Sequence, residues 1–179
     1  MRYKQYYVDN HANDPQFFTG MKTTIYVERI KKLIEITESR DILDYGCGKG
    51  HQYDQLSYGT YWKANVDCYD PAVPSFETLP DKWYDGVICV DVLDLVPEEE
   101  IDQVLNNIFS RALKFAYIAI HDLPKNRTFA DGQDISVTRK SQAWWDEKII
   151  QHNVNRIIVS GALVTDYPVS LELGDLMLD

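Results

Sequence analysis

The stretch DILDYGCGKG, residues 41–50, places a short apolar run before an aspartate and three glycines at alternate positions. Residues 41–45 have the composition of a buried strand, and Asp44 stands two residues before Gly46. Glycine adopts backbone conformations with positive φ, and it has no side chain to keep a ligand away from the main chain. A strand that ends in such a loop predicts a binding site where a ligand approaches the backbone closely.

Two classes of nucleoside ligand use a glycine loop of this kind. Dinucleotide-binding proteins use the spacing G-x-G-x-x-G to bring a pyrophosphate to the N-terminus of a helix. Here Gly46, Gly48 and Gly50 are followed by His51, so the spacing is G-x-G-x-G. The carboxylate of Asp44 would repel a pyrophosphate and attract a cation. The loop therefore favours S-adenosylmethionine, whose ammonium group we expect to meet Asp44 and the loop carbonyls.

The rest of the chain alternates between strand and helix patterns, which predicts a Rossmann-like, doubly wound, mostly parallel α/β sheet with right-handed crossovers. We expect helices at 22–38, 51–59, 97–113 and 141–153, and further strands at 62–70, 85–91 and 114–120. The proline-rich segment 71–83 predicts no more than a short extended piece near 76–78. Residues 154–173 read as two strands joined by a turn near Gly161, which places one antiparallel strand at or near an edge.

Acidic residues and a histidine stand where the predicted strands end. These residues are Asp44, Asp70, Asp91 and His121. Ligands of such sheets bind outside the carboxyl ends of the strands, where the strand order reverses. Asp70 follows Gly50 by 20 residues and can accept hydrogen bonds from two ribose hydroxyls. The sequence therefore predicts a nucleoside site at this edge of the sheet.

Composition narrows the classes of partner. The chain has 179 residues, 45% of them hydrophobic, which suits one domain. The net charge is −10 and the basic residues are scattered, so we expect a small-molecule partner rather than nucleic acid. No apolar run approaches the length of a membrane span, and the N-terminal residues show no signal peptide. The three cysteines form no CxxC pair, so we expect reduced thiols, no metal site and a cytoplasmic location.

Several of these segments resemble known motifs. ILDYGCGKG, residues 42–50, resembles motif I of class I S-adenosylmethionine-dependent methyltransferases, and CYDP, residues 68–71, resembles their acidic ribose-binding loop. Residues 84–101 resemble the fourth-strand motif of the family and the helix after it. An opening LDYGCGKG-x-QY and a late segment FADGQDISVTRKSQAWW are similar to those of short bacterial and phage methyltransferases of unassigned substrate. The resemblance covers roughly residues 15–150.

The resemblance implies a single methyltransferase domain, residues 1–179. It would comprise an N-terminal lid and helix (1–38), a cofactor-binding core (41–120), a substrate-side insertion (121–145) and a C-terminal hairpin (154–173). The residues expected to bind S-adenosylmethionine are Asp44, Gly46, Cys47, Gly48, Gly50, Tyr53, Asp70, Pro71, Asp91 and Val92.

The acceptor is expected to be a small molecule or glycan-like. A base is needed only if that acceptor must lose a proton. The candidates are His121, with Asp122 to orient it, and Asp91, although His121 could equally be a solvated histidine at a strand end. Phe18, Trp144 and Trp145 are candidate substrate contacts, and one of the two tryptophans is expected in the core.

Two departures from the related methyltransferases leave other functions open. Those proteins often carry Glu-His where this chain has Asp94 and Leu95, and Asn and His where it has Asp134 and Ser136. A non-catalytic module that binds S-adenosylmethionine or S-adenosylhomocysteine is therefore one alternative. An NAD-dependent oxidoreductase is another, disfavoured by the glycine spacing and by Asp44.

Overall fold

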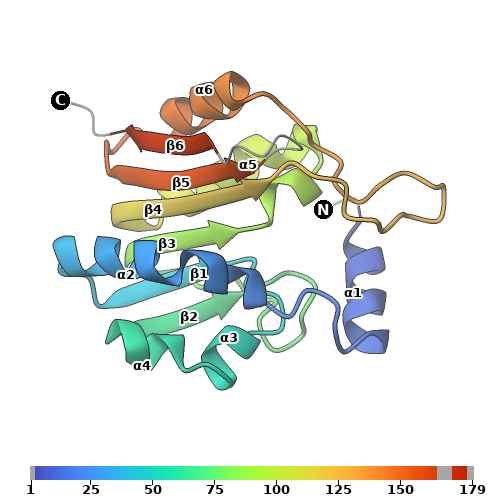
Figure 1. Cartoon of the computed structure of the whole chain (residues 1–179), viewed down its shortest axis with the longest axis horizontal. Helices are drawn as coiled ribbons and strands as arrows, with labels where there is room; N and C mark the ends of the chain where they lie inside the picture. Colours follow the sequence, from blue (N-terminus) through green and yellow to red (C-terminus); the bar gives the residue numbers. More distant parts are fainter. Residues whose placement is uncertain (1–2, 165–170, 177–179) are drawn as a thin grey trace.

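A computed structural model describes residues 3–164 and 171–176, which form one sheet with helices on both faces (Figure 1). The strand order is β2-β1-β3-β4-β5-β6, and the first five of these run parallel. The predicted α/β class with a Rossmann-like, mostly parallel sheet is thereby confirmed. The strands are β1 (Asp41–Tyr45), β2 (Asn65–Tyr69), β3 (Tyr84–Val90), β4 (Ala112–His121), β5 (Ile158–Val164) and β6 (Leu171–Leu176).

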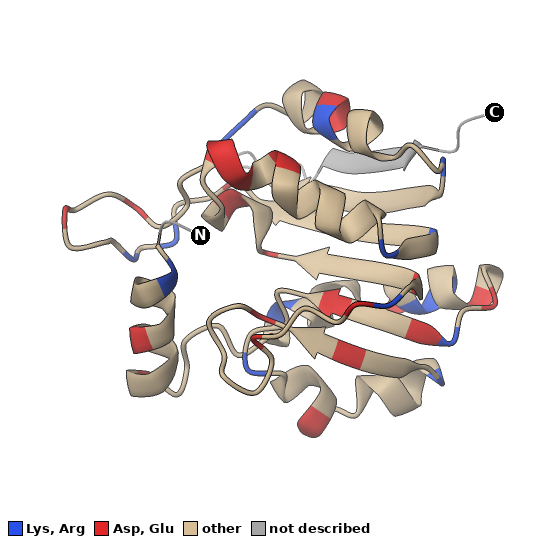
Figure 2. Cartoon of the chain, turned by 180° about the vertical axis from the view of Figure 1, so that it is seen from behind, with Lys and Arg blue, Asp and Glu red and all other residues tan. Residues whose placement is uncertain are grey.

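Helices cover the two faces of the sheet, one seen from the front in Figure 1 and the other in Figure 2. The α-helices are α1 (Lys4–Asn13), α2 (Val27–Ile36), α3 (His51–Asp54), α4 (Tyr58–Trp62), α5 (Glu98–Phe109) and α6 (Gln142–His152), with 3₁₀ turns η1 (Met21–Tyr26) and η2 (Leu93–Leu95). Apolar side chains of α2 and α4 pack on one face, and those of α5 and α6 pack on the other. None of the helices in the described ranges has the length and apolar character needed to cross a bilayer.

The central strands are apolar on both faces because helices cover both sides of the sheet. In β4, Phe115 and Tyr117 pack towards α2, whereas Ala116 and Ile118 pack towards α5 and α6. All four side chains are fully buried. This double burial explains why the strands appear in the sequence as continuous apolar runs rather than as alternating patterns.

The switch point of the sheet lies between β1 and β3. From β1 the chain crosses to β2 on one side and then returns to β3 on the other. The glycine loop begins directly after β1, with Gly46, Gly48 and Gly50 at φ 85, 58 and 75°. A Cβ atom on Gly48 would lie 2.1 Å from the carbonyl oxygen of Phe18, so the N-terminal segment packs directly on the loop.

Three expected elements differ from the structure. The helix predicted at 22–38 begins as the 3₁₀ turn η1 and becomes α-helical only at Val27. The helix predicted at 51–59 is two short helices, and Gly59 lies inside α4 rather than ending it. The extended piece expected near 76–78 forms no strand.

The turn predicted near Gly161 is wrong. Gly161 lies in the middle of β5, where it is in parallel register with Ile118 of β4. An apolar strand can continue through glycine when neighbouring strands on both sides supply hydrogen-bond partners, as β4 and β6 do here. The strand β6 pairs antiparallel with β5 at the edge of the sheet. The connection at residues 165–170, on which the predicted hairpin depends, lies outside the described residues.

An N-terminal helix that the sequence analysis did not identify, α1, stands across the carboxyl ends of the strands (Figure 1). Its Tyr3 stacks on Phe129 with ring centroids 4.0 Å apart, and Tyr6 and Tyr7 contact the same ring. Phe129 belongs to the polar segment between β4 and α6. The two segments therefore meet over the edge of the sheet where a ligand site was predicted.

The contact between Gly48 and the N-terminal segment can be tested by adding a methyl group. Gly48→Ala should lower the free energy of unfolding by about 3 kcal/mol, from the left-handed backbone and the overpacking together. Gly132→Ala is the matched control, since Gly132 also has positive φ (85°) but a Cβ there would meet nothing within 4 Å. Its cost should be about 1 kcal/mol. Equal losses for the two variants in urea denaturation would contradict the close packing.

Candidate functional site

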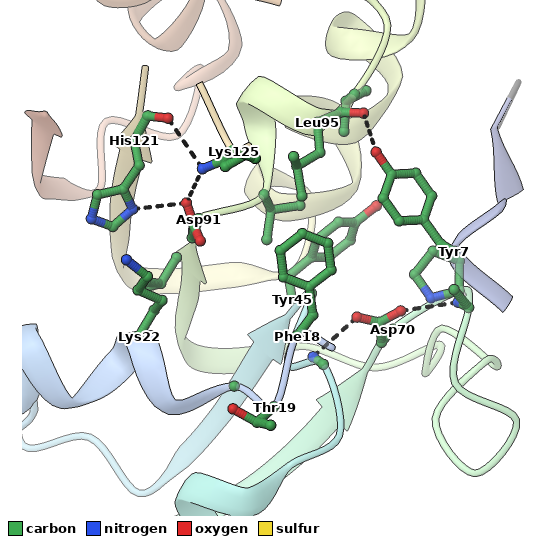
Figure 3. Close-up of a pocket in the computed structure, with 18 of the residues that line it drawn as sticks. Tyr7, Phe18, Thr19, Lys22, Tyr45, Asp70, Asp91, Leu95, His121 and Lys125 are labelled. Carbon is green, nitrogen blue, oxygen red and sulfur yellow. Dashed lines mark hydrogen bonds and ion pairs between the residues drawn. The ribbon is translucent and has the colours of Figure 1, made fainter. Parts of the chain in front are cut away.

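A cavity of about 670 Å³ opens at the carboxyl ends of β1, β2 and β3, beside the switch point (Figure 3). The N-terminal segment and the segment after β4 complete its wall. Figure 3 shows Asp70 and Tyr7 on one side of the cavity and His121, Asp91 and Lys22 on the other. Of the residues predicted from the sequence, the cavity is lined by Phe18, Gly46, Gly48, Asp70, Pro71, Asp91, Val92 and His121.

Every backbone N–H group from Gly46 to His51 donates a hydrogen bond within the protein. The acceptors are Tyr69 O for Gly46 and Cys47 (2.7 and 3.1 Å), Asp70 Oδ2 for Gly48 (3.0 Å), Phe18 O for Lys49 (3.0 Å), Cys47 O for Gly50 (3.3 Å) and Thr19 O for His51 (3.1 Å). A phosphate-binding loop needs such N–H groups directed at the ligand. The loop at 46–51 therefore has no N–H donor left for a phosphate.

Asp70 is the carboxylate that faces the cavity beside this loop. Its Oδ2 accepts the Gly48 N–H at 3.0 Å, and its Oδ1 accepts the Ala72 N–H at 2.9 Å. Burial raises the pKa of Asp70, while the two N–H groups oppose that rise. Each carboxylate oxygen can accept more than one hydrogen bond. Asp70 is thus oriented by the backbone and can still accept hydroxyl groups of a ligand.

Asp44 lies behind the loop, contrary to the expectation that it meets the ligand. Its side chain is buried, and its Oδ2 accepts hydrogen bonds from Gln52 Nε2 (2.9 Å) and Tyr53 OH (2.6 Å). Neither Asp44 nor Tyr53 lines the cavity. Burial raises the pKa of Asp44 to about 6, against the lowering effect of these two hydrogen bonds. The two residues hold α3 against β1 and support the loop from beneath.

Cys47 and Gly50 also lie away from the cavity wall. The Cys47 thiol is buried and its Sγ lies 3.3 Å from the Gly48 carbonyl oxygen. A Cβ on Gly50 would lie 3.1 Å from the ring of Phe76. Both residues shape the turn, and neither contributes an atom to the lining. Of the three alternate glycines, only Gly46 and Gly48 border the cavity.

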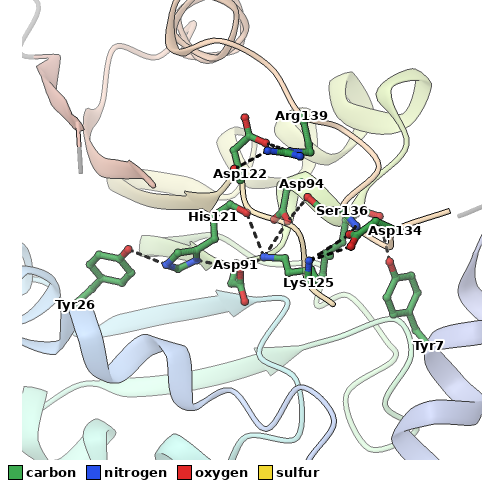
Figure 4. A network of polar contacts seen from close by, with 11 residues as sticks. Tyr7, Tyr26, Asp91, Asp94, His121, Asp122, Lys125, Asp134, Ser136 and Arg139 are labelled. Carbon is green, nitrogen blue, oxygen red and sulfur yellow. Dashed lines mark hydrogen bonds and ion pairs between the residues drawn. The ribbon is translucent and has the colours of Figure 1, made fainter. Parts of the chain in front are cut away.

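A network of buried charges, which the sequence analysis did not foresee, lies at the other side (Figure 4). The Nζ of Lys125 forms ion pairs with Asp91 Oδ1 and, at 2.9 Å, with Asp94 Oδ2. It also donates to the carbonyl oxygen of His121 at 3.2 Å. Asp94 is fully buried and also accepts a hydrogen bond from Ser136 Oγ at 3.0 Å. This network fastens the segment after β4 onto the end of β3.

Both ring nitrogens of His121 are engaged by protein groups. Nδ1 lies 2.9 Å from Asp91 Oδ1, and Nε2 lies 3.1 Å from Tyr26 OH. His121 is 5% exposed, and its Nδ1 is fully buried. Asp122, expected to orient His121, does not line the cavity and instead forms an ion pair with Arg139 at 2.7 Å. The predicted His121–Asp122 pair is therefore not formed.

Asp91 is held in an uncommon conformation at the centre of this network. Its φ is 62°, in the left-handed region that few residues other than glycine adopt. Burial alone would raise the pKa of Asp91, but the contacts with His121 and Lys125 outweigh burial and hold that pKa below its usual range. A carboxylate with a lowered pKa is a weak proton acceptor. Backbone strain of this kind is concentrated at functional sites.

The two tryptophans do not reach the cavity. Trp145 is 0% exposed and lies in the core that α5 and α6 share with the sheet. Trp144 packs edge-on against it at 4.8 Å, with Lys140 and Lys148 over its ring. One tryptophan was expected in the core, and Trp145 lies there; the candidate substrate contact of the other is not at this cavity, because α6 packs against a sheet face and α5. Phe18, by contrast, lines the cavity as predicted.

The lid over the cavity is tied to the glycine loop by Lys49. Its Nζ donates to the carbonyl oxygens of His11 (2.9 Å) and Asp14 (2.7 Å) at the end of α1. Asp14 in turn pairs with Arg127 at 3.0 Å. Tyr7, whose hydroxyl donates to Leu95 O at 3.4 Å, and His11 line the cavity from α1. Lys49 of the glycine loop thus holds the N-terminal segment that covers the cavity.

The sequence carried no local signal for Lys125, Tyr7 or His11. They become cavity residues only when the segment after β4 and α1 fold over the strand ends. No protein-family model matches this chain, and neither does any curated protein. The geometry of the cavity and the sequence motifs are therefore the basis for a functional proposal.

Removal of Lys125 should destabilise the protein strongly. Lys125→Met leaves Asp91 and Asp94 buried without their cation, so the free energy of unfolding should fall by about 3–5 kcal/mol. Lys148→Met is the matched control, because the Lys148–Asp102 pair has a 54% exposed carboxylate, and its loss should cost less than about 1 kcal/mol. Urea denaturation at neutral pH measures both. A small loss for Lys125→Met would show that the buried network contributes little.

Asp44 should make the folded protein more stable as the pH falls. Its pKa is about 6 in the folded protein and about 3.9 in an unfolded chain, so between these values the folded state binds more protons. The contribution of Asp44 to the free energy of unfolding therefore decreases as pH rises from about 4 to about 6, by at most about 1.4 kcal/mol per pH unit. In Asp44→Asn this decrease should disappear. Identical stability–pH curves for the variant and the wild type would contradict the raised pKa.

Proposed function

We propose that this chain binds S-adenosylmethionine at the carboxyl ends of β1, β2 and β3 and transfers its methyl group to a small-molecule acceptor. The observation that carries the proposal is the polarity of the glycine loop. Its N–H groups are all used within the protein, so the main chain at residues 46–51 has no donor for a phosphate, and the ammonium group of the cofactor would meet carbonyl oxygens of the loop. Such a loop suits an ammonium group and disfavours a phosphate.

The remaining wall of the cavity fits the rest of the cofactor. Asp70, oriented by two backbone N–H groups, would accept the ribose hydroxyls. Pro71, Val92 and Val104 provide an apolar surface for the adenine ring. Asn107 also lines the cavity and offers an amide to the polar edge of the base. All of these residues line the same cavity.

When bound, S-adenosylmethionine supplies a methyl group already activated by the sulfonium. The work left to the protein is to align the acceptor and to exclude water. Phe18 and Tyr7 would exclude water, since both line the cavity from the N-terminal lid. Lys49 keeps this lid against the loop through its two bonds to α1. The lid is thus part of the proposed site.

Two other functions predict different binding results. An NAD-dependent oxidoreductase must place a pyrophosphate against the loop, where no N–H from Gly46 to His51 is available to it. A non-catalytic module would bind S-adenosylmethionine but transfer nothing, and the engagement of both nitrogens of His121 favours it over a base-dependent transferase. Binding assays separate the first alternative from the proposal, and transfer assays separate the second.

The test has two parts. S-adenosylhomocysteine should raise the melting temperature of the protein, and NAD should not. A donor with a deuterated methyl group, incubated with the protein and a cell extract, should then give a product of increased mass. Stabilisation by NAD alone would overturn the proposal, and binding without any labelled product would leave the module in its place.

Asp70 should be the main side chain that binds the cofactor. Asp70→Asn should weaken S-adenosylhomocysteine binding about 10- to 100-fold, because hydrogen bonds to a charged group contribute about 1.5–3 kcal/mol. Asp67→Asn is the control on β2, the strand that precedes Asp70, since Asp67 pairs with Lys82 outside the cavity at 2.8 Å. The Asp67→Asn variant should bind S-adenosylhomocysteine with the affinity of the wild type. Calorimetric titration measures both, and equal affinities for the two variants would contradict the role of Asp70.

A further inference from the structure

The far side of the cavity from Asp70 carries a distinct set of charges. Figure 3 shows Lys22 extending from the N-terminal segment towards Asp91 and His121. Lys125 is already paired with Asp91 and Asp94, and Arg127 is paired with Asp14. Lys22 lines the cavity and, within the described residues, forms no ion pair. It is thus a cation at this end of the cavity that a ligand could neutralise.

The same end offers no competent base. Both nitrogens of His121 contact protein groups, and the carboxylate of Asp91 is shared between His121 and Lys125. Asp70 lies on the opposite side of the cavity, and two backbone N–H groups engage it. Beside Lys22, an alcohol or another neutral acceptor that needs a proton removed would find the side chains of Asp91 and His121 already held by protein contacts. The acceptor that best suits this end of the cavity is therefore a nucleophile without a proton to lose.

We infer that the acceptor is a carboxylate, that its anionic group lies against Lys22, and that the product is a methyl ester. The inference rests on the proposed methyl transfer and names the substrate class of the same site. Lys22 and Lys125 balance Asp91 and Asp94 in charge. A sulfonium adds one positive charge to this end, and a carboxylate cancels it. Lys22 is thereby a residue that determines specificity.

The reaction needs no proton transfer. One carboxylate oxygen forms a bond to the methyl carbon while the carbon–sulfur bond breaks, and the electron pair of that bond stays on sulfur. The negative charge of the acceptor and the positive charge of the sulfonium disappear together. No base, metal or further co-reactant enters the balance. This balance suits a site whose histidine and aspartate are occupied by structural contacts.

The chemical stability of the labelled product tests the inference directly. Small molecules from a cell extract are incubated with the protein and a deuterated methyl donor, and the products are split into two portions. In the portion treated with mild alkali the label should leave as methanol, because methyl esters hydrolyse. Alkali-stable label, as in ethers, methylamines or thioethers, would overturn the carboxylate acceptor while methyl transfer itself stands. No label at all together with no S-adenosylhomocysteine binding would instead reject the proposed function.

Binding of a simple carboxylate gives a second readout that needs no turnover. The protein saturated with S-adenosylhomocysteine should bind benzoate more tightly than benzyl alcohol in an NMR titration. Lys22→Met should weaken benzoate binding about fivefold, the upper range of an exposed ion pair, whereas Lys22→Arg should retain it. Lys32→Met, at an exposed lysine of α2, is the control and should change nothing. No binding of benzoate, or equal binding by wild type and Lys22→Met, would overturn the role of Lys22.

Discussion

The backbone N–H groups of residues 46–51 all donate hydrogen bonds within the protein, and most other features of the site depend on this. The acceptors come from the N-terminal segment, from β2 and from the loop itself. The loop therefore joins three parts of the chain, and its conformation is set before any ligand arrives. A preformed loop loses little conformational entropy on binding. No N–H donor of residues 46–51 is left for a ligand, which separates this loop from loops that bind phosphates.

Burial on both faces explains why the sheet could be predicted from the sequence. The runs that became β1, β3 and β4 are apolar throughout, because helices cover both sides of the central strands. The end of β5 and the place of α1 could not be predicted in this way. Gly161 is a local signal for a turn, yet hydrogen bonding from β4 carries the strand through it. The aromatic side chains of α1 pack against Phe129, more than a hundred residues away, and show no helical apolar stripe of their own.

The site was predictable in its position and less so in its contacts. Strand ends and the glycine loop placed Asp70, Asp91 and His121 on one cavity. The direction in which each side chain points was harder to predict, because successive side chains of a strand point to opposite faces. Asp44 is turned beneath the loop, where Gln52 and Tyr53 can reach it, and not towards the cavity. Lys125 had no local signal, since its partners lie about thirty residues back in the chain.

A buried lysine between two buried aspartates is costly to maintain, and a hydrophobic core of the same volume would serve stability at least as well. The arrangement is explained if its role is to fix the positions of the Asp91 and His121 side chains. Lys125 draws the carboxylate of Asp91 towards the segment after β4, and Tyr26 holds the other side of the imidazole. The result is a wall of the cavity in which buried charges of opposite sign hold one another in place. Such a wall can orient an acceptor without exchanging protons with it, which is the property that links the buried charges to the proposed base-free methyl transfer.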